Sequence, residues 1–289
     1  MSESVVAPAI ALTRENILVH ARLLPAAPQV LGGLCELLAD ANVDLDRIAA
    51  EIRLEPALAA RVLRVSNSAA FSGGQRIGSV DEAVTRVGFG EVLQLVGAAT
   101  VAGVVDRELS CYGISADRLR ETMLLHGLAA EALAARAGLD SRDAYSAGLL
   151  RAVGMMVVDH AGRLVLKAAE AFDPARHATY AAWEEERFGV TGMEAAALVF
   201  ESWQFPPQLA NAMRQHLRVD DEAAVDRFSL ILHLAGGIVA ERKLALPGES
   251  SCWNVTPARL EAAGLDEEQY LRASNQAAAS FERQRAALY

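Results

Sequence analysis

The segment from Glu91 to Val105 is nearly all apolar, and it restricts the possible folds more than any other part of the sequence. Gln94 and Thr100 are the polar residues that interrupt it. A helix that is apolar on every side must be buried on every side, and a run of this length is too short to cross a bilayer. We therefore expect this segment to be the central helix of a bundle.

Apolar residues elsewhere in the chain recur at helical spacing. Leu58, Val62 and Val65 fall at i, i+4 and i+7 and so share one helix face. Ser79 and Glu82 have the spacing of a capping box, which marks the start of another helix. No alternating strand pattern of useful length occurs, and aromatic residues make up only 6% of a chain that is 52% hydrophobic. These patterns predict an all-α fold.

Polar and irregular stretches suggest how the chain is divided. We expect a flexible tail over residues 1–13, a helical bundle over 14–114 and a second helical domain over 115–289, which ends in a helical extension. The boundary falls at a short polar connection, and the two helical parts are expected to pack as one body. The longest irregular stretch covers residues 244–257.

The charge balance argues against nucleic acid as a partner. The chain carries 27 Lys and Arg against 37 Asp and Glu, a formal net charge of -10. Nucleic-acid binding needs clustered basic residues that neutralise phosphates. We therefore expect no nucleic-acid partner.

The cysteines and the N-terminus favour the cytoplasm. Cys35, Cys111 and Cys252 are far apart, odd in number and without a C-x-x-C pair, which argues against a disulfide framework or a cysteine zinc site. The first sixteen residues carry no basic region typical of a signal peptide. We expect a soluble cytoplasmic protein that does not enter a membrane.

Common catalytic and nucleotide-binding motifs do not occur. The sequence has no G-x-G-x-x-G after a strand, no P-loop, no G-x-S-x-G and no H-E-x-x-H. His126, His216 and His233 fall on the inward faces of their expected helices. They could form a zinc-like site, or each could be a buried histidine with local hydrogen bonds. We favour the second alternative, because no acid lies at a spacing that would complete a ligand set.

Four stretches, in this order, carry a resemblance to a known family. They are RLLPAAPQVLGGLCELL (Arg22–Leu38), EPALAARVLRVSNSAAF (Glu55–Phe71), IGSVDEAVTRVGF (Ile77–Phe89) and ESWQFPPQLANAMRQH (Glu201–His216). The Leu-Arg-x-x-Asn-Ser block within the second is the most specific. The chain resembles the HDOD family, the HD-related output domains of bacterial signalling proteins, over about residues 18–217. The resemblance implies an N-terminal helical bundle packed on a degenerate HD-superfamily helical domain.

The resemblance also draws attention to the segment Ser146–His160, which we expect to be one core helix. HD phosphohydrolases place a metal-binding His-Asp pair after a Gly-Leu-Leu run, and here Gly148–Leu150 is followed by Arg151 and Ala152. Alanine has no ligand atom, and arginine is a permanent cation that repels a metal ion. The resemblance therefore implies a lost metal site, with no metal and no cofactor, and Arg151 is expected to fill the empty pocket or to pair with an acid there.

Few residues of the HD pattern remain in the sequence. His126 and His216 occupy residual HD-type positions, and a later histidine position falls on Gly192. Asp159 and His160 lie too far along the expected helix to replace the lost pair. We expect these two residues to form an exposed helix end.

The resemblance implies regulation rather than turnover. It predicts a non-catalytic, stand-alone signal-transduction protein that binds other signalling proteins in trans. A divergent metal-dependent phosphohydrolase or phosphodiesterase, using His126, His216 and His233, is the alternative. A third hypothesis is that the vacated pocket binds a cyclic dinucleotide through Arg151, because arginine suits phosphate recognition.

The most family-like block supplies the candidate contact residues Arg61, Arg64 and Asn67. The two arginines could contact an anion or a partner, or simply form an outer face. Asn67 and Ser68 are also expected to brace a helix end through local backbone hydrogen bonds. The loop around Trp253 is expected to be a mobile contact surface.

Overall fold

The computed structural model confirms the predicted all-α fold. Helices make up the regular structure of the described residues, which contain no strand but one isolated antiparallel bridge between Leu109 and Ile114. Most of the expected tail, residues 1–10, lies outside this set. The described residues are 11–24, 33–34, 37, 40, 43–68, 76–105, 107–167, 170–218 and 225–285.

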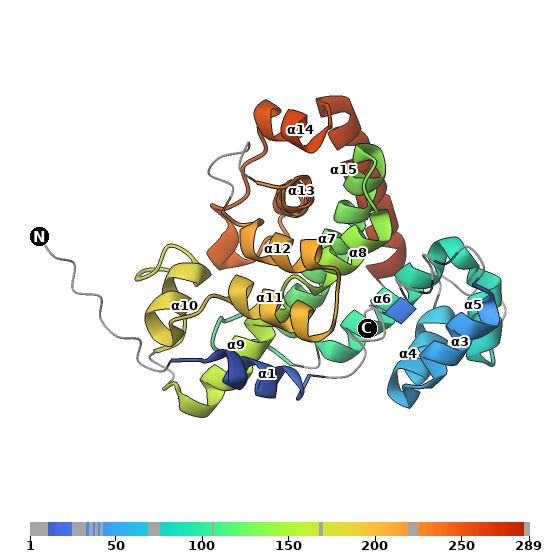
Figure 1. The fold of residues 1–289 in the computed structure, drawn as a ribbon, viewed down its shortest axis with the longest axis horizontal. Coiled ribbons are helices and arrows are strands. Elements are labelled where there is room, and N and C mark those ends of the chain that lie inside the picture. Colours follow the sequence, from blue (N-terminus) through green and yellow to red (C-terminus); the bar gives the residue numbers. More distant parts are fainter. Residues whose placement is uncertain are drawn as a thin grey trace, which may run out of the picture.

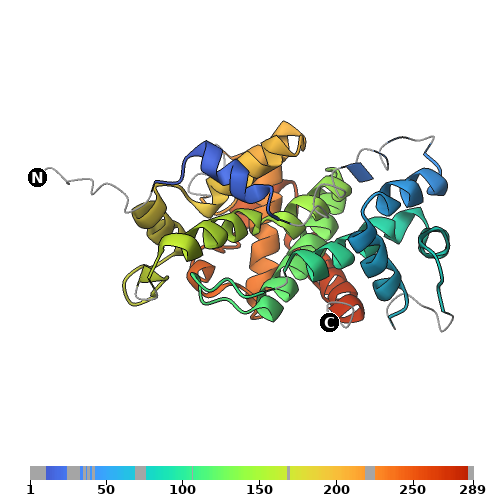
Figure 2. The same ribbon diagram turned by 90° about the horizontal axis from the view of Figure 1, so that it is seen from below.

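Four helices gather at one end of the molecule (Figures 1 and 2). They are α3 (Leu45–Arg53), α4 (Pro56–Ser66), α5 (Val80–Val87) and α6 (Phe89–Val104). Ser79 caps α5 by accepting a hydrogen bond from the Glu82 backbone N–H, as the capping-box pattern predicted. Each of these helices contacts at least two of the others, so they form a bundle of their own.

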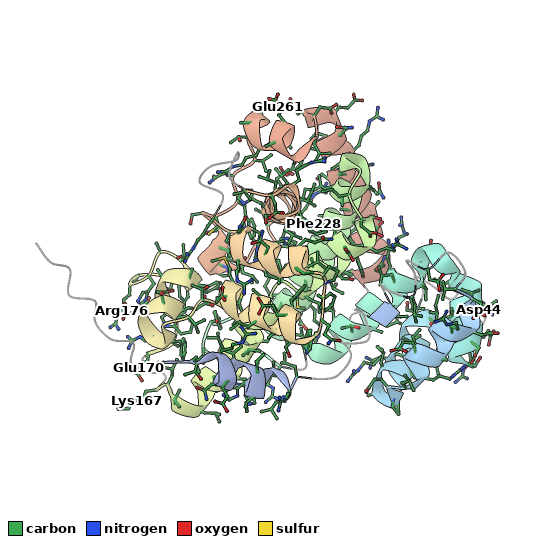
Figure 3. All side chains as sticks on the ribbon, in the orientation of Figure 1. Asp44, Lys167, Glu170, Arg176, Phe228 and Glu261 are labelled. Atoms are coloured by element: carbon green, nitrogen blue, oxygen red, sulfur yellow. The ribbon has the colours of Figure 1, made fainter. Side chains whose placement is uncertain are left out.

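The long helix α7 organises the rest of the described chain, where it packs against α8, α13 and α15. Buried side chains fill the space between the helices in both parts of the molecule and form one continuous core (Figure 3). The remaining helices are α7 (Ala116–Ala137), α8 (Ser141–Leu150), α9 (Val153–Val165), α10 (Tyr180–Phe188), α11 (Gly192–Ser202), α12 (Pro207–Gln215), α13 (Arg227–Glu241), the 3₁₀ turn η2 (Pro247–Glu249), α14 (Pro257–Ala263) and α15 (Glu267–Arg285).

The first helix, α1 (Arg14–Ala21), lies apart from the N-terminal bundle. It packs on α9 and α11, with Ile17 buried and the His20 and His160 rings 5.1 Å apart. The sequence predicts one bundle over residues 14–114, and the position of α1 differs from that prediction. Its buried apolar face is short and is covered by the second half of the chain.

Helix α6 joins the N-terminal bundle to the rest of the chain, and Gln94 is its polar contact. The Gln94 side chain donates to Glu131 Oε2 of α7 at 2.8 Å and accepts from Gln284 Nε2 of α15 at 2.7 Å. The polar interruption in the apolar run therefore has a structural role. Across the described residues, no helix combines the length and apolar character needed to cross a membrane.

The prediction that Ser146–His160 is one helix was wrong. Helix α8 ends at Leu150, Arg151 and Ala152 form a turn, and α9 begins at Val153. Gly148 lies against the backbone of α7, whereas Gly154 lies against the backbone of α11. The turn lets each half of the segment pack closely on a different neighbour.

Candidate functional site

The three histidines converge on Trp253. His126 comes from α7, His216 follows α12 and His233 comes from α13. Their ring centroids lie 5.7, 6.2 and 5.7 Å from that of Trp253. The loop that we expected to be a mobile contact surface instead inserts an indole ring among the histidines.

Each histidine is buried and contacts a backbone carbonyl oxygen. His126 Nε2 lies 3.0 Å from a carbonyl of α13, and His216 Nδ1 lies 3.1 Å from two carbonyls of its own helix. His233 Nδ1 lies 2.9 Å from the carbonyl oxygen of His216. Burial, reinforced by the charge of Arg151, lowers the pKa of His126 far below its ordinary value and that of His216 to about 3. Both rings are therefore neutral at neutral pH.

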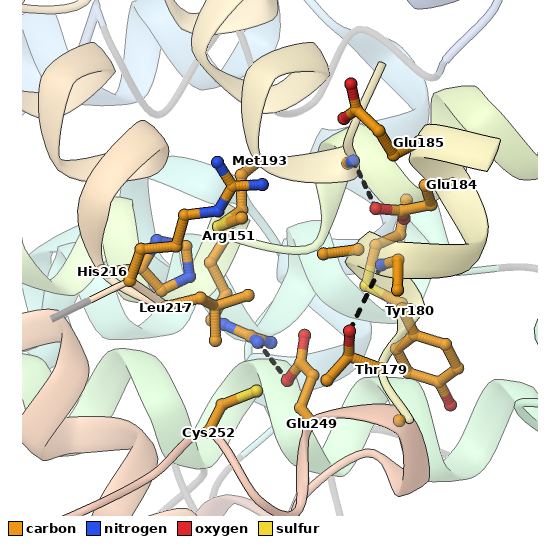
Figure 4. A pocket seen from close by; sticks show the side chains of 16 residues that line it. Arg151, Thr179, Tyr180, Glu184, Glu185, Met193, His216, Leu217, Glu249 and Cys252 are labelled. Atoms are coloured by element: carbon orange, nitrogen blue, oxygen red, sulfur yellow. Dashed lines mark hydrogen bonds and ion pairs between the residues drawn. The ribbon is translucent and has the colours of Figure 1, made fainter. Parts of the chain in front are cut away.

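Arg151 pairs with Glu249 (Figure 4). Its guanidinium also lies over the Trp253 ring. The two side chains are 2% and 5% exposed, and the guanidinium carbon is 5.2 Å from the ring centroid. Pairing of Arg151 with an acid was one of the two expected arrangements. The identity of that acid was not predicted, because Glu249 lies in an irregular segment far along the chain.

These residues do not fit a divalent metal ion. Arg151 places a permanent positive charge near His126 and His216, and Ala152 offers no ligand atom. Each histidine has at least one ring nitrogen against a backbone carbonyl, and the three rings surround Trp253. Among the described residues, no three His, Cys, Asp or Glu side chains are grouped so that they could hold a metal ion.

A cavity of about 380 Å³ lies beside the Arg151–Glu249 pair (Figure 4). Glu184 forms part of its wall and accepts hydrogen bonds from the Tyr112 hydroxyl at 2.6 Å and the Gly192 backbone N–H at 2.7 Å. Burial raises the pKa of Glu184 to about 7. The wall also has an apolar part, formed by Met155, Met193 and Leu217. Its other polar side chains include Glu185, His216 and Arg218.

The comparisons with known proteins decide the family. The HDOD domain model matches residues 24–219, which is more than half of the chain. The chain belongs to the HDOD family. No curated protein sequence matches it.

Solved structures share the fold of this HDOD protein. A Shewanella amazonensis protein, provisionally named a phosphohydrolase, has 22% identity and a TM-score of 0.68, with 95% of this chain and 98% of that chain covered. An HDOD domain protein of unknown function from Geobacter sulfurreducens has 22% identity and a TM-score of 0.62, with 96% and 98% covered.

A third solved structure is provisionally named a signal transduction protein and comes from Marinobacter aquaeolei. It has 20% identity and a TM-score of 0.68, and the match covers 95% of this chain but 64% of that one. At these identities the comparisons establish the fold.

The candidate contact residues of the HDOD protein lie away from the cavity, on and after α4. Asn67 accepts from the Ile77 backbone N–H at 2.8 Å and donates to the Ile77 carbonyl oxygen at 3.0 Å, which is the expected bracing role. Arg61 lies against Gly103 of α6, and Arg64 is exposed. The structure therefore does not bring Arg61, Arg64 and Asn67 together with Arg151.

Asp159 is buried, so its expected place at an exposed helix end was wrong. Its Oδ1 accepts from the Cys111 backbone N–H at 2.9 Å, and its Oδ2 lies 3.0 Å from Arg163 Nε. Asp159 thus ties the connection before α7 to α9. This contact joins residues far apart in sequence, which the helical pattern does not reveal.

Proposed function

We propose that this HDOD protein is a non-catalytic bacterial signal-transduction protein that acts by binding other proteins in the cytoplasm. The observation that carries the proposal is the filled HD-type centre. Trp253 lies among His126, His216 and His233, and the Arg151–Glu249 pair lies beside it.

Metal-dependent phosphohydrolysis requires a metal ion that lowers the pKa of a bound water. The three histidines could supply ligand atoms to a metal ion only if Trp253 left the centre. Arg151 would then still oppose a divalent cation at short range. The name phosphohydrolase describes the Shewanella protein. At 22% identity, the similarity supports a shared fold and not a shared activity.

The cavity is also a poor match for a cyclic dinucleotide. With its acids ionised, the wall has three carboxylates, Glu184, Glu185 and Glu249, against the two arginines Arg151 and Arg218, so two phosphates would meet an excess of negative charge. The positive charge of Arg151 is already paired with Glu249. The two Arg151 nitrogens without a hydrogen-bond partner, Nε and Nη1, have almost no accessible surface. These charges favour the protein-binding role over the nucleotide-binding one.

A turnover assay tests the proposal. The protein is incubated with Mg²⁺, Mn²⁺ or Zn²⁺ and with bis(p-nitrophenyl) phosphate or a cyclic dinucleotide. We expect no product above the metal-only blank, and no heat of binding for the dinucleotide. Product formation that disappears on His126→Ala would support the phosphohydrolase alternative and refute the proposal.

We place the partner contact on the surface of α4, at Arg61, Arg64 and Asn67. Arg64 is exposed, and the Asn67 brace holds the end of the helix in position. Cross-linking in the source cells should give less partner adduct with Arg64→Glu than with wild type. The matched control is Arg47→Glu on α3, which is also exposed. Equal loss of adduct in both variants would contradict this placement.

A further inference from the structure

We propose that the cavity beside Arg151 and Glu249 binds a small organic cation: a primary amine or guanidine with an apolar body. The inference rests on the proposed function, because a cavity free of catalytic metal chemistry is available for a regulatory ligand. The cavity lies between α9, α10, α11, the residues that follow α12, and η2 with the segment after it (Figure 4).

The first step of the argument concerns hydrogen bonding. His216 Nδ1 faces two carbonyl oxygens, so it carries the ring proton and Nε2 is left as an acceptor. His216 is 2% exposed and lines the cavity. No hydrogen bond to its Nε2 is found among the described residues. A buried acceptor at a cavity wall favours a ligand that brings an N–H donor.

The second step concerns charge. Three carboxyl groups, those of Glu184, Glu185 and Glu249, line the cavity, against the guanidinium groups of Arg151 and Arg218. One Glu249 oxygen binds Arg151, and among the described residues no hydrogen bond to the other is found. With all the acids ionised, the wall has an excess of one negative charge. A monocation neutralises this excess, whereas a phosphate would add to it.

The third step concerns shape. Met155, Met193 and Leu217 supply apolar surface, and flexible methionines adapt to varied ligand bodies. A cavity of about 380 Å³ is within the usual size range for small-molecule sites. Glu185 and Arg218 are exposed, so they lie on the side of the cavity that faces solvent. The amine would therefore lie near the carboxyl groups, with its apolar part against the methionines.

The groups that face Glu184 give the site a diagnostic property. Tyr112, Glu185 and Glu249 surround this carboxyl group, and its pKa lies close to neutral. A bound cation would favour the ionised carboxylate, so binding should release protons near pH 7. Affinity should then rise as pH increases through 7. Calorimetry in two buffers of different ionisation enthalpy measures this release.

A matched ligand series tests the proposal. Ligand-observed NMR and calorimetry would compare phenethylamine, 3-methylbutylamine and benzylguanidine with the isosteric 2-phenylethanol, 3-methylbutanol and 3-phenylpropanoate. We expect the cations to bind about tenfold or more tightly than the alcohols, since hydrogen bonds to charged groups are the stronger ones, and the carboxylate not to bind. Equal binding of alcohols and amines, or no binding of any amine, would overturn the proposal.

Variants on one helix locate the site. Glu185→Gln and Glu184→Gln should each weaken amine binding by about tenfold, the loss of one charged hydrogen bond. Glu186→Gln is the control, because Glu186 is the next residue on α10 but pairs with His177 outside the cavity. Circular dichroism confirms that each variant is folded. Equal loss in all three variants would overturn the assignment. The binding readout is independent of phosphodiester turnover, so the proposal and the proposed function can fail separately.

Discussion

At the scale of single residues, Arg151 and Glu249 form a buried ion pair, and each charge depends on the other as its partner. A buried charge without a partner is strongly unfavourable, whereas a hydrogen-bonded pair offsets much of its desolvation. Trp253 adds a cation–π contact on one face of the guanidinium. The pair therefore connects the turn between α8 and α9 to η2, and loss of either partner would leave a buried charge unpaired.

Removal of one partner should expose this dependence. Arg151→Ala is expected to lower the free energy of unfolding by about 3–5 kcal/mol, because Glu249 is left buried and unpaired. Urea unfolding measures the change. The control Arg176→Ala removes an exposed pair with Asp173 and should cost under about 1 kcal/mol. A similarly small effect for Arg151→Ala would contradict the buried-pair account.

Glu184 gives a pH-dependent prediction. Its pKa is about 7 when folded and near the ordinary 4.5 when unfolded. As pH falls from 7 to 4.5, the folded protein binds a proton at Glu184 before the unfolded chain does. The free-energy cost of the buried carboxylate therefore decreases. Between pH 5 and pH 8 the wild type should therefore lose stability as Glu184 ionises, whereas Glu184→Gln does not titrate. The difference in free energy of unfolding between the variant and the wild type should increase by up to about 3 kcal/mol over this range. Parallel stability profiles of the two proteins would argue against a buried acid.

Sequence reasoning located part of the site. Arg151, His126 and His216 were identified from the family pattern, and the structure places all three around Trp253. The sequence predicts a surface contact at Trp253, whereas the structure places its half-buried ring among the histidines. Contacts between residues far apart in the sequence leave no local pattern, so neither this position nor the acid partner of Arg151 could be predicted.

At the scale of elements, the break between α8 and α9 determines where Arg151 lies. Periodicity predicts that a segment is helical, but it does not report which neighbour each half packs against. Gly148 and Gly154 indicate that another helix packs closely against each position. The sequence does not reveal that these helices are α7 and α11. The helix starts marked by capping residues, such as Ser79, were predictable because capping is local.

The close contact of α9 with α11 should be sensitive to a single methyl group. A Cβ at Gly154 would clash with the Gly192 carbonyl oxygen, and backbone cannot move aside cheaply. We expect Gly154→Ala to reduce the free energy of unfolding by about 3 kcal/mol or more. Gly78→Ala is the control, since its Cβ would meet only a side-chain oxygen at 3.8 Å. Equal stabilities of the two variants would disprove the tight contact.

At the scale of the whole molecule, we propose two units that differ from the expected boundaries. The first is the bundle of α3 to α6, and the second contains α7 to α15 together with α1. The all-α class followed from the apolar central run and the absence of strand patterns. The position of α1 did not, because a short amphipathic helix can pack on either unit.

Hydrogen exchange tests this division. Amides of α3, α4 and α5 should exchange faster than those of α7 and α8, because among the described helices the main contacts of the bundle with the larger core are those of α6 with α7 and α8. Gln94→Ala removes the polar contacts of this junction and should widen the difference. Uniform exchange across both units would contradict the division.

The central claim is that the filled HD-type centre has no room for catalytic metal. Elemental analysis of the untagged protein, purified without chelator and then equilibrated with Zn²⁺ or Mn²⁺, tests it most directly. The account predicts far less than one metal ion per chain, and the same value for His126→Ala. One metal ion per chain that is lost in His126→Ala would contradict it.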